Sequence, residues 1–198
     1  FGMCLLEMAT GEYPYQECPK PFEIYKRVTS GIKPDNYYRI DNEDLRELID
    51  LCTRLKRSQR PTVKELVNHS WFMDSQGLKL EMLKSEDGKQ ILYENDSQVT
   101  FRLKVGDKTK RKIQWPDNEE IEFVFDVDSD DPEQVVKELK EKTGKITDED
   151  LRFLTQAIKD KCLVFKLEKE DRIGEEDTTN NSTLYNSNKQ QNNDSTIN

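Results

Sequence analysis

The sequence predicts an α+β chain: a helical segment, then a segment of mixed strands and helices, then a polar tail. Apolar residues recur at helical spacing within residues 1–74, alternate with polar residues within 78–128, and nearly disappear in 174–198. The 198 residues are 33% hydrophobic and 36% charged. A chain of this length holds one or two domains, and so low an apolar fraction predicts that part of it does not fold.

Three helices are expected in the first segment. One follows a capping residue, Asp41 or Asn42, and its apolar residues share one face: Leu45, Leu48, Ile49 and Cys52. A shorter helix follows Pro61 and Thr62, with three residues expected to face inward: Val63, Leu66 and Val67. Another begins at Pro21 and ends before Gly31 and Pro34, and it carries Phe22, Ile24, Tyr25 and Val28.

The second segment begins with a period of two, which is typical of half-buried strands. Apolar and polar residues alternate over 78–83, 99–105 and 121–127. Between these runs, Asp87-Gly88 and Gly106-Asp107 supply residues that favour turns. We therefore expect three strands.

Helices return after the third strand. Asp131 is the expected N-cap, Pro132 fits the first helical position and Gln134 fits a capping box, with an inner face of Val135, Val136 and Leu139. A further helix starts at Thr147 with an acidic first turn, and three residues lie on one side: Leu151, Leu154 and Ile158. Residues 163–167 continue this helix or form a last strand; periodicity leaves both open.

The last residues are too polar to form a core. Asn, Gln, Ser and Thr account for 16 of the 25 residues in 174–198. Burying so little apolar surface does not offset the entropy lost on ordering, so we expect a disordered polar tail over 171–198. The two segments that precede this tail are predicted to span residues 1–74 and 76–170.

The charge balance narrows the possible partners. The formal net charge is −9; residues 1–74 carry 11 Lys or Arg and 12 Asp or Glu, and the rest carries 20 and 28. An acidic second half disfavours nucleic acid and anionic membranes and favours a basic ligand. No apolar stretch approaches the roughly 18 residues of a membrane-spanning helix, so no membrane insertion is expected.

The N-terminal residues and the cysteines point to a cytoplasmic protein. The chain starts at Phe1 with neither an initiator Met nor a basic leader, which predicts that it begins inside a larger protein. Its four cysteines form no C-x-x-C pair and His69 is the only histidine, so we expect reduced thiols and no metal site.

Residues 1–74 resemble the end of a protein kinase domain. The resemblance is carried by the runs 1–10 and 25–31 and by the closing run from Arg60-Pro61-Thr62 to Trp71-Phe72. More narrowly, residues 12–18 and 28–34 are similar to the with-no-lysine (WNK) Ser/Thr kinases. The resemblance implies a parent kinase that uses ATP and Mg²⁺.

The catalytic parts of a kinase are not in this sequence. A Gly-rich loop, the phosphate-binding Lys, the H-R-D Asp and the D-F-G Asp all precede Phe1 in that family. We therefore expect no catalytic residue, no cofactor and no phosphate transfer in these 198 residues. In kinases the residue matching Arg60 pairs with a Glu of an A-P-E motif, also absent, so Arg60 is expected to be a half-made structural ion pair or to face solvent.

Residues 76–170 resemble the small module that follows WNK kinase domains, akin to the C-terminal domain of the oxidative-stress-responsive kinases. The runs 118–126 and 130–139 and Ala157-Ile158-Lys159-Asp160 carry this resemblance. Such modules bind Arg-Phe-x-Val/Ile peptides between a strand and a helix. The resemblance assigns the peptide Arg to two carboxylates and the peptide Phe to a pocket; the residues are Asp130 and Glu138, then Phe123, Leu139 and Ile146.

The residue chemistry supports the same assignment. A guanidinium has a planar fork of donors, which suits two convergent carboxylates. Asp130 precedes a helix and Glu138 lies about two turns into it, so one ligand can reach both. The alternatives are a helix cap and a solvated face for these acids, and core packing for Phe123 and Leu139.

Weaker signals favour ordinary structural roles. The spacing of Asp126, Asp128 and Asp130 imitates a calcium loop, but the Gly and Glu that the loop needs are missing. The basic run 108–112 is expected to be a solvated loop. Arg152-Phe153-Leu154-Thr155 nearly spells the peptide ligand, and its place in a helix favours an accidental likeness.

The sequence thus predicts the C-terminal part of a WNK-type kinase. Its module is expected to dock Arg-Phe-x-Val/Ile motifs of downstream kinases or of its own chain, and so to regulate ion-transport and osmotic signalling. The alternative is a structural brace that packs on the kinase lobe and binds no peptide.

Overall fold

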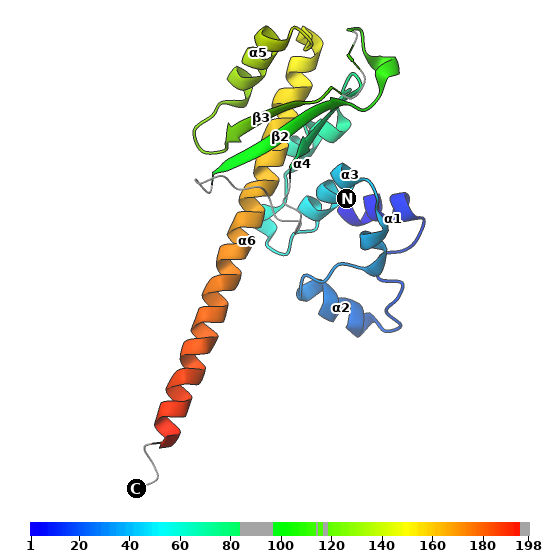
Figure 1. Cartoon of the computed structure of the whole chain (residues 1–198). Helices are drawn as coiled ribbons and strands as arrows, with labels where there is room; N and C mark the ends of the chain where they lie inside the picture. Colours follow the sequence, from blue (N-terminus) through cyan, green and yellow to red (C-terminus); the bar gives the residue numbers. More distant parts are fainter. Residues whose placement is uncertain (84–96, 114, 117–118, 195–198) are drawn as a thin grey trace. The chain divides into compact units, whose positions relative to one another are not determined.

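The computed structural model describes residues 1–83, 97–113, 115–116 and 119–194, and its description of side chains ends at Arg172. It confirms the α+β class, with helices, a three-stranded sheet and further helices following one another along the chain (Figure 1). The expected turn at Asp87-Gly88 lies outside the described residues. By its contacts the chain divides into two compact units, Phe1–Cys162 and Leu163–Asn198. The boundaries at 74, 76, 170 and 171 stay predictions.

The kinase-like segment holds four helices, joined by loops and short 3₁₀ turns: α1 (Gly2–Thr10), α2 (Pro21–Thr29), α3 (Glu43–Cys52) and α4 (Val63–Val67). Asn42 caps α3 as expected, because its side chain accepts a hydrogen bond from the Leu45 amide at 3.0 Å. Leu6 of α1 and Ile49 of α3 are buried in one small core. Gly2 lies so close to Cys52 that a Cβ at Gly2 would clash with it, which shows how tightly α1 and α3 pack.

The expected inward face of α4 is wrong. Val63 and Val67 are 77% and 71% exposed. This five-residue helix is fixed by its first turn: the Thr62 side chain accepts from the Glu65 amide, and the Glu65 carboxylate accepts from the Thr62 amide at 2.7 Å. A capping box can specify where a helix starts without any buried face.

The sheet contains the three expected strands, β1 (Leu78–Met82), β2 (Gln98–Val105) and β3 (Ile121–Asp126), in the order β1-β2-β3. Both pairings are antiparallel, and Phe101 of β2 stands opposite both Met82 and Phe123. The apolar positions of β1 and β2 are buried except for the half-buried Val105, whereas β3 buries fully only Phe125. β1 and β3 are the two edge strands, so the outer edge of β3 is not paired with another strand of this sheet.

Two helices follow the sheet, α5 (Pro132–Thr143) and α6 (Asp148–Asp194). Val136 and Leu139 form the buried side of α5 as expected, whereas Val135, also expected on that face, is only half-buried. Residues 163–167 belong to α6. Of the two structures that periodicity leaves open for this run, a helix or a last strand, the helix is the one observed. The α6 backbone also continues through Asp194, into the segment for which composition predicts disorder; extending a formed helix costs far less than starting one.

No helix in the described part of the chain is both long and apolar enough to cross a membrane.

Candidate peptide groove between β3 and α5

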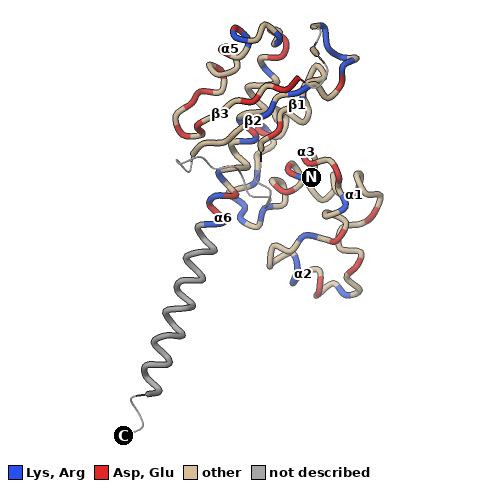
Figure 2. The backbone as a smooth tube through the Cα atoms, in the orientation of Figure 1, with Lys and Arg blue, Asp and Glu red and all other residues tan. Residues whose placement is uncertain are grey.

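The turn that joins β3 to α5 is built from acidic side chains and backbone amides. The Asp126 carboxylate accepts from the amides of Asp128 and Ser129, at 3.0 and 3.2 Å. The Asp130 carboxylate accepts from the Asp126 amide at 2.8 Å. Asp131 then caps α5, since it accepts from the Gln134 amide at 3.1 Å. These bonds fix the acidic turn beside the positive N-terminal end of the helix (Figure 2).

A groove of about 500 Å³ lies between β3 and α5. Its lining comes from the outer positions of β3, the acidic turn and one face of α5. The lining residues are Phe123, Val124, Ser129, Asp130, Asp131, Gln134, Val135, Glu138, Leu139 and Lys142. Four of the five residues that the sequence assigns to peptide binding therefore lie together at one opening.

The two assigned carboxylates lie in the same groove, one on the turn and one on α5. Glu138 accepts from the Gln134 side-chain amide at 3.2 Å and pairs with Lys142 at 3.5 Å. Hydrogen bonds from Gln134 and then from Lys142, followed by the charge of Lys142, hold the pKa of Glu138 below its ordinary value, so the side chain is negatively charged at neutral pH. Asp130 is exposed to solvent. The groove therefore offers a cation two acidic groups from two different elements.

The apolar part of the groove is shallow and partly open. Phe123 is half-buried, and its ring centroid lies 5.6 Å from that of Phe101. Leu139 is buried, whereas Val124 is 48% exposed. The sequence argument missed Val124, Val135 and Lys142. The α5 members could have been found from helical spacing, since 134, 135, 138, 139 and 142 share one face.

Ile146 is not at the groove. Its side chain is only 2% exposed and is not part of the groove lining. The helix α5 ends at Thr143, the next residue Gly144 turns the chain with a left-handed φ of +64°, and the apolar residue after the turn is buried. We therefore do not keep Ile146 among the groove residues.

Arg60 is exposed to solvent, and its side chain forms two hydrogen bonds. Its Nε donates to the carbonyl oxygen of Arg54 at 2.6 Å, and its second terminal nitrogen donates to that of Leu55 at 3.2 Å. Both carbonyls belong to the loop that follows α3, so Arg60 holds this loop through its backbone acceptors.

One member of the basic run 108–112 departs from the predicted solvated loop. Arg111 forms an ion pair with Asp150 at 2.7 Å, and the two side chains are 4% and 0% exposed. Arg111 also donates to the carbonyl oxygen of Lys145 at 2.8 Å, and its guanidinium lies over the Trp115 ring. The basic run contains no pattern that predicts the burial of Arg111, because the partner Asp150 lies 39 residues further along the chain.

A second polar cluster connects α6 to the kinase-like segment. The Lys161 side chain is 8% exposed and donates to Asp44 and Glu47 of α3, each at 2.7 Å. Burial lowers the pKa of Lys161, but the two carboxylates outweigh it and leave the pKa above its ordinary value. Asp160 accepts from the Ser70 amide at 2.7 Å. Burial lowers the pKa of the neighbouring His69, whose Nδ1 accepts from the Trp71 amide.

Among the described residues, no three His, Cys, Asp or Glu side chains are arranged to hold a metal ion. The calcium-like aspartates 126 and 130 instead accept hydrogen bonds from backbone amides of their own turn.

The fold and the groove define a class of protein: a protein kinase segment followed by a domain of the oxidative-stress-responsive type. The family profile "Protein tyrosine and serine/threonine kinase" matches residues 1–69. The profile "Oxidative-stress-responsive kinase 1 C-terminal domain" matches residues 99–162, which include all of β2 but its first residue, together with β3, the groove and α5.

Known proteins narrow the class. The chain is 41% identical over 178 residues to the serine/threonine-protein kinase WNK of Caenorhabditis elegans and 39% identical over 166 residues to WNK3 of Mus musculus, which covers 87% and 84% of this chain. It is 38% identical over 160 residues, 80% of the chain, to Wnk of Drosophila melanogaster. The chain belongs to the WNK family of serine/threonine kinases. It spans 9%, 9% and 6% of the length of these three relatives.

Proposed function

We propose that the domain with the groove docks Arg-Phe-x-Val/Ile peptides. The observation that carries the proposal is one opening lined by two carboxylates, Asp130 and Glu138, and two apolar residues, Phe123 and Leu139. The peptide Arg would lie against the acidic turn, and the peptide Phe would lie on the apolar wall.

The available interactions suit a docking site of moderate affinity. A hydrogen bond to a charged group contributes about 1.5–3 kcal/mol, and burying a Phe side chain contributes about 1.5–3 kcal/mol. The loss of translational and rotational freedom on association opposes both. Together the two interactions contribute about 3–6 kcal/mol before that loss, whereas micromolar binding corresponds to about 8 kcal/mol. Further contacts along the peptide must therefore supply the rest for binding to reach the micromolar range.

Calorimetric titration of residues 1–198 with an Arg-Phe-x-Val peptide tests the proposal. We expect Asp130→Asn and Glu138→Gln each to weaken binding about tenfold, because each removes a charge that holds the guanidinium. Raising the salt concentration should also weaken binding, since ions screen the charges.

Glu141→Gln is the matched control. Glu141 is exposed on α5 and does not line the groove, and its substitution removes the same charge as the other two substitutions. Its peptide affinity should equal that of the wild type. Equal affinity for all three variants would refute the carboxylate assignment.

The structural brace remains a second candidate because of one observation, the buried Lys161 held by two carboxylates of α3. If α6 braces the kinase-like segment and the groove binds no peptide, Lys161→Met should lower the free energy of unfolding by about 2 kcal/mol or more, and the wild type should show no binding of the Arg-Phe-x-Val peptide. Chemical denaturation followed by circular dichroism measures the first, and titration measures the second. An unchanged free energy of unfolding in Lys161→Met would refute the bracing role.

The activity of the longer protein is also a proposal. We infer that its kinase domain phosphorylates Ser or Thr with ATP and Mg²⁺, in the cytoplasm, and that docking connects it to downstream kinases or to its own chain in ion-transport and osmotic control. The motifs that would hold ATP and Mg²⁺ are not among these 198 residues. No step of that chemistry is therefore assigned to them.

A further inference from the structure

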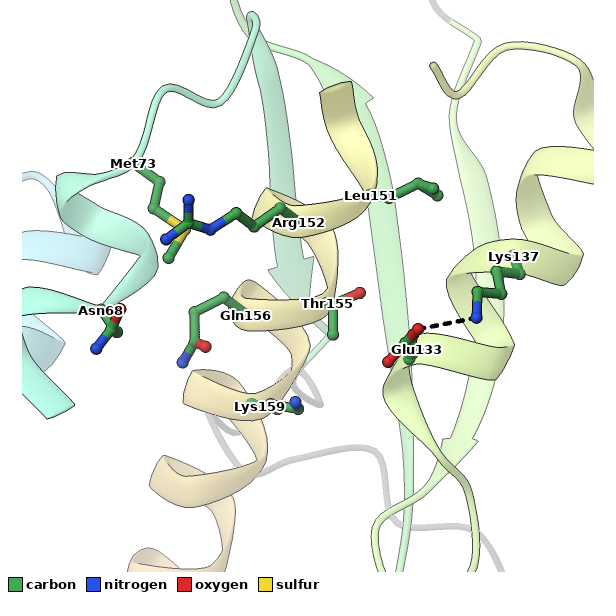
Figure 3. A pocket seen from close by; sticks show the side chains of 9 residues that line it. All are labelled: Asn68, Met73, Glu133, Lys137, Leu151, Arg152, Thr155, Gln156 and Lys159. Atoms are coloured by element: carbon green, nitrogen blue, oxygen red, sulfur yellow. Dashed lines mark hydrogen bonds and ion pairs between the residues drawn. The ribbon is translucent and has the colours of Figure 1, made fainter. Parts of the chain in front are cut away.

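A second pocket, which we call the basic pocket, has a volume of about 320 Å³ (Figure 3). Its residues come from the end of the kinase-like segment, from α5 and from the first turns of α6. They are Asn68, Met73, Glu133, Lys137, Leu151, Arg152, Thr155, Gln156 and Lys159. It shares no residue with the groove, because α5 contributes Glu133 and Lys137 here and different residues there.

The lining of the basic pocket is positive in an acidic chain. It contains three cations, Lys137, Arg152 and Lys159, and one carboxylate, Glu133, whereas the chain as a whole carries a net charge of −9. Lys137 pairs with Glu133 at 2.8 Å, which accounts for the carboxylate (Figure 3). The side chains of Arg152 and Lys159 are exposed and form no hydrogen bond or ion pair with any part of the chain that the structure describes.

The two unpaired cations lie on one face of α6. Arg152, Thr155 and Lys159 follow at i, i+3 and i+7, so their side chains are neighbours along the helix. Figure 3 shows Thr155 between them along α6, with Asn68 and Met73 to one side and Lys137 and Glu133 to the other. Arg152 and Lys159 are two turns apart on α6, and in Figure 3 the Arg152 side chain runs toward Met73, away from Thr155. One ligand can contact both cations only if these two long, exposed side chains bend toward it.

We propose that the basic pocket binds the phosphate group of a phosphorylated Ser or Thr side chain in a peptide. A phosphomonoester carries a charge of about −1.5 to −2 at pH 7 and three acceptor oxygens, which matches two unpaired cations. A ligand with a single carboxylate would neutralise only one of the two cations. The planar Arg152 guanidinium can donate two parallel hydrogen bonds to a phosphate, and Lys159 adds a point charge.

Binding by this pocket is separate from docking in the groove. The proposal does not depend on Asp130 or Glu138, and removing Arg152 and Lys159 leaves all ten residues of the groove in place. The two sites can therefore be tested one at a time on the same chain.

The test is a nuclear magnetic resonance titration of residues 1–198. The probes are the peptide Gly-Gly-phosphoserine-Gly-Gly, the same peptide without phosphate, and inorganic phosphate. In the wild type, the phosphopeptide should shift the amide signals of Arg152, Thr155, Gln156 and Lys159, and the unphosphorylated peptide should not. The variant R152Q/K159Q should bind the phosphopeptide at least about tenfold more weakly.

The variant K56Q/R57Q is the matched control. It also removes one Lys and one Arg, both exposed and outside the pocket, and should bind the phosphopeptide as the wild type does. R152Q/K159Q should keep the affinity of the wild type for an Arg-Phe-x-Val peptide, which shows that it is folded.

Three results would overturn the proposal. One is equal binding of the two pentapeptides by the wild type, a comparison that needs no variant to fold. Another is an equal loss in both double variants. The third is a shift of these amides by inorganic phosphate alone, which would make the pocket a site for free phosphate and not for a phosphopeptide.

Discussion

Replacing Arg111 with Met is expected to lower the free energy of unfolding by about 3–5 kcal/mol. Asp150 is 0% exposed, and without Arg111 its charge would remain buried with only the Thr147 amide and hydroxyl as partners, at 2.7 and 2.8 Å. The carbonyl oxygen of Lys145 would lose its donor as well. Breaking a buried pair on one side costs far more than the pair itself contributes, because the remaining charge stays away from water.

Urea denaturation followed by circular dichroism measures this loss. Lys112→Met is the control, because the neighbouring Lys112 pairs with Glu149 at the surface, where both side chains are more than half exposed. Exposed pairs of this kind contribute at most about 1 kcal/mol. If both variants lost the same stability, Arg111 would be a surface residue and its burial would be refuted.

Gly77→Ala should destabilise the domain by about 3 kcal/mol, the second large effect. Gly77 has a φ of +79°, and an added Cβ would lie less than 3.0 Å from the carbonyl oxygen of Asp107. The Gly77 carbonyl also accepts from the amides of Gly106 and Asp107, at 2.9 and 3.1 Å. The left-handed backbone costs an L-residue about 1–2 kcal/mol, and relieving the clash would cost about 1–3 kcal/mol more.

Gly144→Ala separates the two contributions. Gly144 has a similar φ of +64°, but nothing lies within 4 Å of an added Cβ. Its substitution should therefore cost only the backbone share, about 1–2 kcal/mol. Thermal unfolding of both variants gives the comparison, and equal losses would show that the close approach of Asp107 does not matter.

Local signals in the sequence predict much of the fold. Asn42 and Asp131 each cap a helix where their residue types and spacing indicate, and the alternating runs become β1, β2 and β3. Asp130 and Glu138 both line the groove between β3 and α5. These features depend on residues close together in the chain or on a regular period, and both can be read directly.

Features set by distant contacts were not predictable in the same way. The burial of Arg111 depends on Asp150, and that of Lys161 depends on Asp44, 117 residues away. The exposure of Val63 and the burial of Ile146 were also missed, because neither position has a periodic pattern that distinguishes a core face from a surface one. A single sequence does not say which distant elements meet.

The most direct test of peptide docking is a double-mutant cycle between Glu138 and the arginine of the peptide. Affinities are measured for wild-type protein and Glu138→Gln, each with an Arg-Phe-x-Val peptide and with the same peptide carrying Ala in place of Arg. If the two groups interact, Glu138→Gln should weaken binding of the Arg peptide clearly and binding of the Ala peptide only slightly. The coupling free energy should then be about 1 kcal/mol or more. Losses that simply add, with no coupling, would contradict the account.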